Sequence, residues 1–457
     1  MPRPQRKAAD GAWRTRLNQA MQAHQKGDLD TAERLYKKVL ALEIAQPDAM
    51  HYLGVLCHQR GRSDEAVQLI RAALEVTPNH PDAHNNLGNV LKESGRLAEA
   101  EASYRRALTC SPDHHNAHVN LAVVLEAQNR VDEAFAAYQS ALERAPHHAH
   151  AHWMLGRALC DHAECVEDME RAVQCFRRAF ELDSRNLAVL QHLALTLYAL
   201  KRKDEAREVY RDWLSRDPEN PVPHHMLAAC GGAPTPTRAG DEYVRNTFDR
   251  FASSFDQQLL EYLDYRAPQV LVDTLKRVLP EATATLDVLD AGCGTGLCGP
   301  LLRPYARRLA GVDLSGGMLE KARQRGDYDE LVEAELTAYL QQHAGAYDIV
   351  ASADTLVYFG DLAPVFTAAF AALRPGGWLG FSLEANEAGG IELSASGRYR
   401  HAREYVEQAL HAAGYVDVRI VADSLRKEAG QPVASWVVLA RRDAGNNGAH
   451  RPSKVWQ

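Results

Sequence analysis

Glycine and aspartate recur at close spacing in the segment LDVLDAGCGTGLCG, residues 286–299, and this pattern suits the binding of a nucleotide-like ligand. The apolar run that ends at Asp290 predicts a buried strand, and the glycines after it predict a tight turn into a helix. A glycine turn lets the backbone approach a ligand closely. NAD-binding folds also use such a turn, so the motif alone leaves the ligand open. The turn contains Gly292, Cys293, Gly294 and Gly296.

Two details separate this turn from a dinucleotide-binding fingerprint. Leu297 stands where that fingerprint has its third glycine, and Asp290 stands two positions before Gly292. A carboxylate at that place can meet the amino group of a methionine moiety. A second predicted strand ends in Asp313, 17 residues after Gly296. Its carboxylate could accept hydrogen bonds from both hydroxyls of a ribose.

Four motifs in this order resemble those of the class I S-adenosylmethionine-dependent methyltransferases. Besides the glycine turn and the Asp313 strand, YDIVASADTLVYF (347–359) resembles the fourth-strand motif, and LRPGGWLGFSLE (373–384) resembles the turn and strand that follow. The resemblance covers 241–442 and implies a Rossmann-like domain with a seven-stranded, mostly parallel sheet, which binds S-adenosylmethionine and transfers its methyl group. It implies that the cofactor contacts are Asp290, Gly292, Cys293, Gly294, Gly296, Asp313, Leu314, Met318, Glu335, Leu336 and Ala353.

An aromatic-rich stretch, YVRNTFDRFASSFDQQLLEYLDYRAP (243–268), predicts a helical lid over 241–279. Its FDQQ…YRAP part resembles the methyltransferase of the Williams–Beuren region and bacterial methyltransferases fused to helical repeats. This resemblance implies that Tyr243, Phe251 and Arg266 help to enclose the cofactor, with Arg266 facing its carboxylate. The alternative for Phe248 and Phe255 is that they are core residues packed on the sheet.

The methyl acceptor has no general signature, because methyl transfer is an in-line displacement in which positioning and desolvation supply most of the catalysis. ADTLVYF is not the (D/N)PP(Y/F) motif that orients planar amide or adenine nitrogens. His401 would suit a general base near neutrality, although a single histidine in a helix-opening turn is more often solvated. The candidates for catalysis are His401, Tyr358 and Asp354, and Thr355 and Tyr399 are candidates for acceptor binding.

Short apolar runs alternate with helical stretches beyond residue 240, which predicts a parallel α/β domain. GGAPTPTRAG (231–240) has no periodicity and is expected to be a linker, and 443–457 is expected to be a disordered tail. Strands are expected near 286–290, 308–312, 331–334, 347–352, 378–384, 416–421 and 434–441.

The first half of the chain repeats with a period of 34 residues. Five small or helix-ending residues recur at this interval: Gly54, Gly61, Ala66, Ala73 and Pro78, followed by Gly88, Gly95, Ala100, Ala107 and Pro112. This pattern resembles the tetratricopeptide repeat, a pair of helices that cross at small residues. We expect six repeats and a capping helix over 13–230, and therefore an all-α solenoid before the α/β domain.

Asn86 and Asn120 occupy equivalent positions on the first helices of two repeats, which line the concave face of such arrays. An asparagine ladder there resembles the repeat superhelix of O-GlcNAc transferase, and side-chain amides can hold a peptide backbone. The neighbouring repeats have Tyr52, Met154 and His192 at this position, so the ladder has only two members. The partner is expected to be a peptide or protein, and a structural or oligomerising array is the alternative; the oligomeric state is not predicted.

His84, His118 and His152 occupy equivalent places in successive repeats. A layer spacing of roughly 10 Å is too wide for one metal ion to bridge, so solvated histidines and no metal site are expected.

Composition bounds the remaining function classes. The chain has 46% hydrophobic and 25% charged residues, and a net charge of −8 without a long Lys/Arg block, which disfavours a nucleic-acid partner. No apolar run approaches the ~20 residues of a membrane helix, so no membrane role is expected. MPRPQRKAADGAW lacks the apolar region of a secretory signal, and the eight cysteines include no CxxC pair. A cytoplasmic protein with reduced thiols is therefore expected.

These patterns predict an S-adenosylmethionine-dependent methyltransferase whose repeat array recruits a peptide or protein for O- or N-methylation. A methyltransferase of small molecules or carrier-bound metabolites, with repeats used for oligomerisation or partner binding, is one alternative. A repeat scaffold with an inactive methyltransferase domain is another.

Overall fold

The computed structural model describes residues 4–252, 255–257, 263–279, 281–394, 396–428 and 430–444, with side chains from residue 13 onward except at 250, 251 and 257. The side chain of Phe251, which was predicted to help enclose the cofactor, is not among the described side chains. Almost all of the predicted tail, 443–457, also lies outside the described residues. The chain divides into two compact units, Met1–Arg202 and Lys203–Gln457. Within the described residues, no helix is both long and apolar enough to cross a lipid bilayer.

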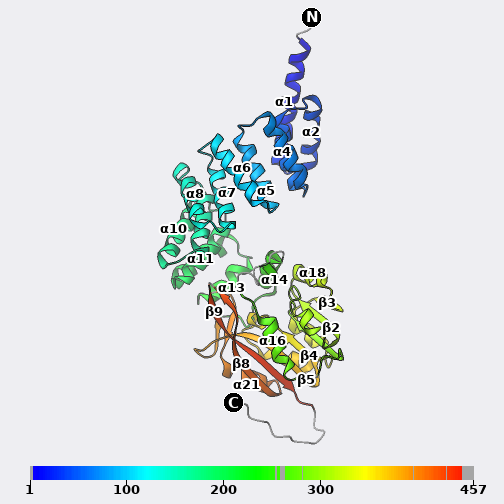
Figure 1. The fold of residues 1–457 in the computed structure, drawn as a ribbon. Coiled ribbons are helices and arrows are strands. Elements are labelled where there is room, and N and C mark those ends of the chain that lie inside the picture. Colours follow the sequence, from blue (N-terminus) through cyan, green and yellow to red (C-terminus); the bar gives the residue numbers. More distant parts are fainter. Residues whose placement is uncertain are drawn as a thin grey trace. The chain divides into compact units, whose positions relative to one another are not determined.

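The first unit is built from helices alone, which pack in consecutive pairs from the first pair to the fifth (Figure 1). The helices are α1 (Pro4–Gln25), α2 (Leu29–Leu42), α3 (Pro47–Gln59), α4 (Ser63–Val76), α5 (Pro81–Glu93), α6 (Leu97–Cys110), α7 (His115–Ala127), α8 (Val131–Arg144), α9 (Ala149–Asp161), α10 (Val166–Leu182) and α11 (Ala188–Ala199).

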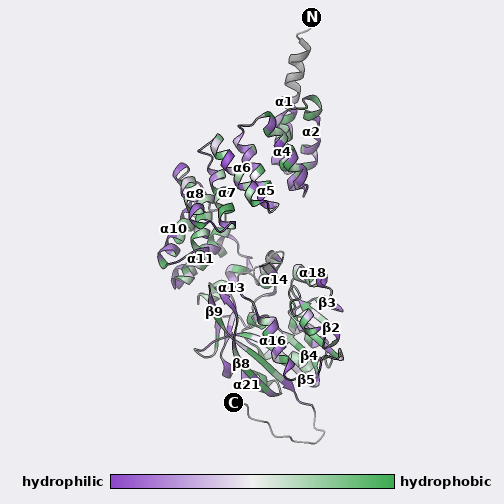
Figure 2. Cartoon of the chain, in the orientation of Figure 1, coloured by the Kyte–Doolittle hydropathy of each residue, from purple (hydrophilic) through white to green (hydrophobic). Residues whose placement is uncertain are grey.

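Glycine on one helix faces an aromatic ring on the next, which explains the small residues of the repeat. A Cβ added at Gly88 of α5 would lie 2.5 Å from Tyr104 of α6, and one added at Gly156 of α9 would lie 2.7 Å from Phe176 of α10. Hydrophobic and hydrophilic residues alternate along these helices (Figure 2), because one face of each packs on its neighbours. The predicted tetratricopeptide pattern is confirmed.

The repeated histidines are partly exposed, and each also has a structural partner. One set occupies the N-cap positions of α5, α7 and α9, the first helices of three repeats. The Nδ1 of each histidine accepts a hydrogen bond from the backbone N–H three residues later. These are His80, His114 and His148, at 3.3, 3.2 and 3.0 Å from the nitrogens of Ala83, Ala117 and Ala151. The Nε2 atoms of a second set lie against proline carbonyls: His84, His118 and His152, at 2.8, 2.9 and 3.0 Å from Pro78, Pro112 and Pro146.

The second unit starts with two helices and continues into an α/β domain. Its helices are α12 (Lys203–Arg216), α13 (Pro221–Ala229), α14 (Asp241–Phe251), α15 (Phe255–Gln257), α16 (Ala267–Lys276), α17 (Gly299–Leu302), α18 (Gly316–Arg325), α19 (Leu336–Gln342), α20 (Ala363–Ala372), α21 (Arg403–Ala412) and the 3₁₀ helix Leu356–Tyr358. Its strands are β1 (Leu286–Ala291), β2 (Ala306–Asp313), β3 (Glu330–Glu333), β4 (Tyr347–Ser352), β5 (Leu373–Ala385), β6 (Ile391–Leu393), β7 (Tyr399–His401), β8 (Tyr415–Glu428) and β9 (Gln431–Arg442).

The strands form one mostly parallel sheet. Five strands lie in the order β3-β2-β1-β4-β5 and are all parallel, and β9 pairs antiparallel with β5 and with β8. The chain runs outward from β1 to β3 and then returns to β4, so the strand order reverses between β1 and β4. Ligands of open parallel sheets bind at the carboxyl ends of the strands at such a reversal.

Within the part of the chain that the structure describes, the sheet has nine strands, two more than expected. The additional strands are β6 and β7, three residues each, which pair with one another, and β7 also pairs with the end of β5. Sequence patterns do not reveal strands of this length, because three residues cannot establish an alternation.

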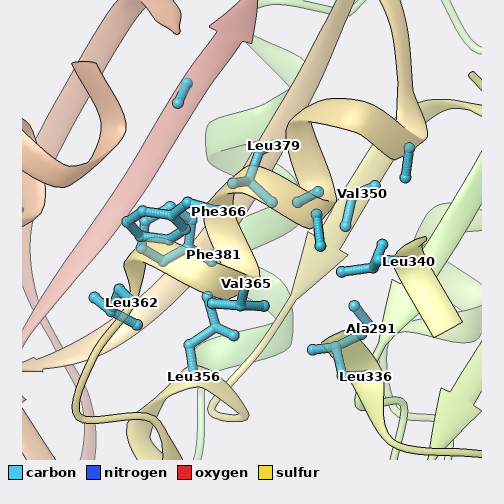
Figure 3. Packing of buried hydrophobic residues seen from close by; sticks show 14 of the residues in the cluster. Ala291, Leu336, Leu340, Val350, Leu356, Leu362, Val365, Phe366, Leu379 and Phe381 are labelled. Atoms are coloured by element: carbon cyan, nitrogen blue, oxygen red, sulfur yellow. The ribbon is translucent and has the colours of Figure 1, made fainter. Parts of the chain in front are cut away.

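Helices cover both faces of the sheet with apolar side chains. On one face, Phe366 of α20 packs on Phe381 of β5 with ring centroids 5.1 Å apart, within a cluster that Figure 3 shows. On the other face, α16 contributes Leu271 and Leu275 to a second cluster with Val288 of β1. The carboxyl ends of the strands are thereby held rigidly for a site.

The segment expected as a linker, 231–240, is bound along the catalytic domain. Thr237 accepts hydrogen bonds through its carbonyl from the N–H groups of Gly360 and Asp361, at 2.9 and 2.7 Å. The N–H of Ala239 donates to the carbonyl of Tyr358 at 2.8 Å. Composition alone suggested a free connection, but extended backbone with unused polar groups can pair with an exposed loop.

Candidate functional site

The three glycines after β1 have positive φ angles of 77°, 53° and 88° and serve different purposes. A Cβ at Gly292 would lie 2.0 Å from Oγ1 of Thr355, so this glycine permits the loop after β4 to approach. A Cβ at Gly294 would meet no atom within 4 Å, which leaves open space beside the turn. Gly296 packs against Tyr328 and does not line the cavity described below.

Asp313 ends β2 with its carboxylate fixed by two backbone groups. Gly294 donates its N–H to Oδ2 and Ser315 donates its N–H to Oδ1, each at 2.9 Å. Burial raises the pKa of this carboxyl above its ordinary value, and the two hydrogen bonds oppose that shift. Each oxygen keeps a lone pair, so the group can accept two further hydrogen bonds from a ligand.

A cavity opens at the carboxyl ends of β1, β2 and β4, and its empty space together with the open solvent at its mouth amounts to about 1180 Å³. Lid residues Phe248 and Phe255 line it, so these aromatics face a ligand site as well as the core. It contains most of the residues that the resemblance assigned to the cofactor, namely Gly292, Cys293, Gly294, Asp313, Leu314, Met318, Glu335, Leu336 and Ala353.

Asp290 lies beneath the turn and is not among the residues that line the cavity. Its side chain is 1% exposed, and its Oδ2 accepts a hydrogen bond from the Tyr328 hydroxyl at 2.6 Å. Burial raises the pKa of Asp290 to about 7. The Asp290 carboxylate therefore does not face the cavity, where it was expected to contact the amino group of a methionine moiety.

Two lid residues also lie elsewhere than expected. Arg266 begins α16, its side chain is 54% exposed, and it faces Asp423 at 3.9 Å. Tyr243 is buried against His225 of α13, with ring centroids 4.3 Å apart. Neither side chain lines the cavity, because Tyr243 packs on α13 and Arg266, the residue before α16, faces Asp423.

Tyr399 and His401 are structural residues of β7, not parts of a helix-opening turn. Both are fully buried and outside the cavity lining. The Tyr399 hydroxyl donates to the carbonyl of Pro236 at 2.8 Å, and Nε2 of His401 lies 3.0 Å from the carbonyl of Gly360. Burial lowers the pKa of His401 to about 4, so it is neutral at pH 7. His401, a candidate general base that was more often expected to be solvated, is instead buried and does not face the cavity.

Asp354, Thr355 and Tyr358 do line the cavity, beside the β4 end of the sheet. Asp354 has φ = 57°, an unusual conformation for a residue other than glycine, and such strain gathers at functional sites. Its carboxylate accepts a hydrogen bond from Arg426 at 2.6 Å. Thr355 donates to the carbonyl of Gly292 at 3.1 Å, which joins this loop to the glycine turn.

Sequence reasoning missed three arginines that line the cavity: Arg238, Arg398 and Arg426. Arg426 lies on β8 and is 2% exposed, although it carries a charge. The sequence signal for Arg426 was its place in a β-rich segment. The burial of a charged side chain cannot be inferred from that place alone, because it depends on partner carboxylates elsewhere in the chain. Those partners, Glu384 and Glu428, come from β5 and the end of β8.

In the first unit, Asn86 and Asn120 use their amide nitrogens within the array. Nδ2 of Asn86 lies 2.8 Å from Nε2 of His51, and Nδ2 of Asn120 donates to Asn85 at 2.9 Å. Burial lowers the pKa of His51 to about 4, so its ring is neutral and accepts the hydrogen bond. The described residues contain no group of three or more His, Cys, Asp or Glu side chains that could hold a metal ion.

Family models match both parts of the chain. Residues 288–377 match a model described as a methyltransferase domain, which covers β1 to the start of β5. Two models described as tetratricopeptide repeats match the helical part, one at 17–84, 59–115, 85–147 and 119–162 and the other at 167–230.

Curated relatives are similar to part of the chain. Methyltransferase-like protein 27 of Homo sapiens is 45% identical over 85 residues, which are 18% of this chain and 34% of that protein. Trans-aconitate 2-methyltransferase of Paracidovorax citrulli (strain AAC00-1) is 35% identical over 106 residues, 23% of this chain and 41% of that protein. The chain thus spans less than half the length of these relatives. The solved structure of pilF from Pseudomonas aeruginosa covers 48% of this chain and 99% of its own at 18% identity, with a TM-score of 0.42.

Proposed function

We propose that this chain transfers a methyl group to an acceptor that its repeats recruit, because it joins tetratricopeptide repeats to a class I S-adenosylmethionine-dependent methyltransferase domain. The observation that carries the proposal is the fixed carboxylate of Asp313 beside the open glycine turn. This pair lies at the reversal of strand order, where parallel sheets bind nucleotides.

The residues of the cavity fit S-adenosylmethionine. Asp313 offers two acceptors for ribose hydroxyls, and Met318 and Leu314 offer an apolar wall for the adenine. Beyond β3, the carboxylate of Glu335 is held by the N–H groups of Thr337 and Ala338 at 3.0 and 2.8 Å. It would place negative charge beside a ligand whose sulfonium and ammonium groups are positive.

S-adenosylmethionine supplies an electrophilic methyl group when bound. The chain's own contribution is to align the two ligands and exclude water, which are the main sources of catalysis in such a displacement. Aromatic side chains of Phe248, Phe255 and Tyr358 line the cavity for that purpose. Asp354 and Tyr358 both line the cavity. The carboxylate of Asp354 is the candidate that could take a proton from a neutral acceptor, and the Tyr358 hydroxyl could orient that acceptor by a hydrogen bond.

A peptide or protein is the acceptor class that the array supports. Among the described residues, nothing donates a hydrogen bond to Oδ1 of Asn120, and this half-buried amide could receive a peptide N–H. A tethered binding module raises the effective concentration of its ligand at the active site without altering the reaction.

A small-molecule acceptor is the second candidate. It is favoured by the apolar, aromatic-lined cavity and by the similarity to an enzyme named for trans-aconitate, a small acid.

Methyl-labelled S-adenosylmethionine separates these candidates. The full chain would be incubated with lysate of a strain that lacks it, and label would be followed in macromolecules and in the low-mass fraction. Label in protein supports the peptide or protein acceptor, and label only at low mass supports the second candidate. Calorimetry with S-adenosylhomocysteine should show micromolar binding; a folded chain that neither binds it nor transfers label would be a scaffold with an inactive domain.

A further inference from the structure

The β5 side of the cavity presents a guanidinium whose hydrogen-bonding capacity is not exhausted. Arg398 lines the cavity and its side chain is 25% exposed. Its Nη1 donates to Glu428 at 2.5 Å and lies 3.4 Å from Glu384, and its Nε lies 3.5 Å from the Tyr358 hydroxyl. Among the described residues, no group accepts a hydrogen bond from Nη2.

Arg426 differs, because all three of its nitrogens have partners. Nη1 donates to Asp354 at 2.6 Å, Nε donates to Glu428 at 3.1 Å, and Nη2 donates to Glu384. Its side chain is 1% exposed, and so is that of Glu384. Arg426 therefore serves as a rigid support that fixes Glu428 and Glu384, and these two carboxylates in turn orient Arg398.

The charges that line the cavity differ between its two ends. At the cofactor end, Asp313 and Glu335 outnumber Arg238, which suits a ligand with a positive sulfonium. At the β5 end, Arg398 and Arg426 line the cavity together with Asp354. Glu384 and Glu428 lie behind the lining and pair with both arginines, and Nη2 of Arg398 stays available to an anionic group of an acceptor.

On the cavity side, aromatic side chains lie near Arg398. Phe248, Phe255 and Tyr358 line the same cavity, and the Phe248 ring lies edge-on to Tyr358 with centroids 5.6 Å apart. A charge-assisted hydrogen bond is stronger in such surroundings than in water. The site thus suits a carboxylate attached to an apolar or aromatic group.

We infer that Arg398 binds a carboxylate of the methyl acceptor, an organic acid with an apolar body that is either a free small molecule or part of a peptide. This inference rests on the proposed function and names the chemistry of its acceptor. Asp313 ends β2, and Arg398 pairs with Glu384 at the end of β5, about 14 Å away at roughly 4.8 Å per strand. A cofactor with its ribose at Asp313 leaves the β5 end to the acceptor.

Two pairs of probes test the carboxylate. One pair is 3-phenylpropionate and 3-phenylpropionamide, and the other is N-acetyl-alanyl-phenylalanine as the free acid and as the C-terminal amide. Binding to the full chain saturated with S-adenosylhomocysteine would be measured by calorimetry or ligand-observed NMR. We expect at least one acid to bind about tenfold more tightly than its amide. A preference within the first pair indicates a small organic acid as the acceptor, and a preference within the second pair indicates a peptide.

Arg398→Gln should abolish the preference for the acid and leave the affinity for S-adenosylhomocysteine unchanged. Arg400→Gln is the matched control, because Arg400 also pairs with Glu384, at 3.2 Å, but does not line the cavity. It should keep the preference. If Arg398→Gln lowers the thermal midpoint strongly, Arg398→Lys keeps the positive charge and should retain part of the preference.

Three results would overturn the inference: equal binding of acid and amide by the wild type, an unchanged preference in folded Arg398→Gln, or a loss of S-adenosylhomocysteine affinity in that variant. The last result would assign Arg398 to the cofactor. The proposed function fails separately, through the absence of S-adenosylhomocysteine binding and label transfer by the wild type.

Discussion

Asp290 and Asp313 end neighbouring strands, and at the scale of single residues their surroundings give them different tasks. Asp313 lines the cavity with both oxygens held by N–H groups of adjacent turns. This role was predictable, because it depends on a strand end and a short loop. The orientation of Asp290 depends on Tyr328, which follows α18 and donates its hydroxyl from a distant part of the chain. Local spacing carries no information about that contact.

Replacement of Asp313 tests the cofactor site. Asp313→Ala removes both charge-assisted acceptors and should weaken S-adenosylhomocysteine binding by about 1–3 kcal/mol in calorimetry. Glu320→Gln on the exposed side of α18 is the control, because it removes a carboxylate whose one ion-pair partner in the described part of the chain is Arg323. Equal affinities of both variants would show that Asp313 does not hold the ligand.

Asp290 makes stability depend on pH. Its pKa rises from 3.8 to about 7 through burial, so between these values the unfolded chain releases a proton that the folded chain keeps. Stability contributed by this site therefore falls as pH rises from 3.8 to 7 and stays low above 7. Asp290→Asn carries no charge and can still accept from Tyr328, so it should be more stable than wild type by up to about 4 kcal/mol at pH 8.

Thermal unfolding midpoints measured from pH 4 to pH 8 check this expectation. The advantage of Asp290→Asn should vanish near pH 4 and grow toward pH 8. An advantage that is independent of pH would indicate a packing effect instead of a buried charge.

Arg398 and Arg426 were beyond prediction for a related reason. They lie before β7 and on β8, while their partners Glu384 and Glu428 lie on β5 and at the β8 end. Arg426 and Glu428 are two residues apart on β8, but the other pairs meet only once the sheet has formed, so no motif of fixed spacing connects the whole group.

At the scale of elements, long periodic segments were predictable and short ones were not. The expected strands all exist, and the β8–β9 hairpin is longer than its apolar core suggested. By contrast, β6 and β7 have three residues each and were not expected. Tyr399 and His401, which were candidate site residues, lie on β7 and are buried structural residues. Neither strand contains enough residues for a pattern.

Helix α13 also has a role that its sequence did not indicate. Nε2 of His225 lies 2.8 Å from the carbonyl of Gly397, directly before Arg398, and the contact is buried. The ring of Tyr243 packs on the same histidine. The repeat-like helix therefore supports the loop that carries the proposed acceptor-binding residue.

Paired variants of neighbouring histidines test this support. His225→Ala removes the bond to Gly397 and should lower the thermal midpoint and raise KM for the acceptor several-fold, while S-adenosylhomocysteine affinity stays unchanged. His224→Ala is the control, since His224 is exposed and its only hydrogen bond among the described residues is to the carbonyl of Pro218, at 2.6 Å. Similar kinetics of the two variants would remove α13 from the acceptor site.

At the scale of the whole molecule, the compact units meet at Arg202 and Lys203, not at the expected linker. The sequence pattern placed α12 and α13 with the repeats, and the repeat model at 167–230 agrees with that pattern. Compactness instead groups them with the α/β domain, because α13 and the following segment are hydrogen-bonded to it. Repeat periodicity describes the local fold of a helix pair and not which neighbours it packs against.

Two truncations follow from this division. A protein that begins at Lys203 should bind S-adenosylhomocysteine as the full chain does, with KM for a recruited acceptor raised about tenfold or more and kcat little changed, the pattern of lost uniform binding. A protein that begins at Asp241 lacks Arg238, Ala239 and the Thr237 bonds, and should lose cofactor affinity or stability. Collapse of kcat in the first truncation would show that the array takes part in the chemistry.

The bonds of His225, Pro236 and Thr237 also bear on how such a chain can evolve. Repeat arrays change length by gaining or losing whole copies, since each repeat contacts mainly its neighbours. Copies that precede Lys203 can be duplicated or deleted without rewriting the active site, which would alter the reach and partner choice of the array alone. Recombination that crosses α13 would sever the catalytic domain from its own support. We expect natural variation in repeat number to be confined to the segment before α12.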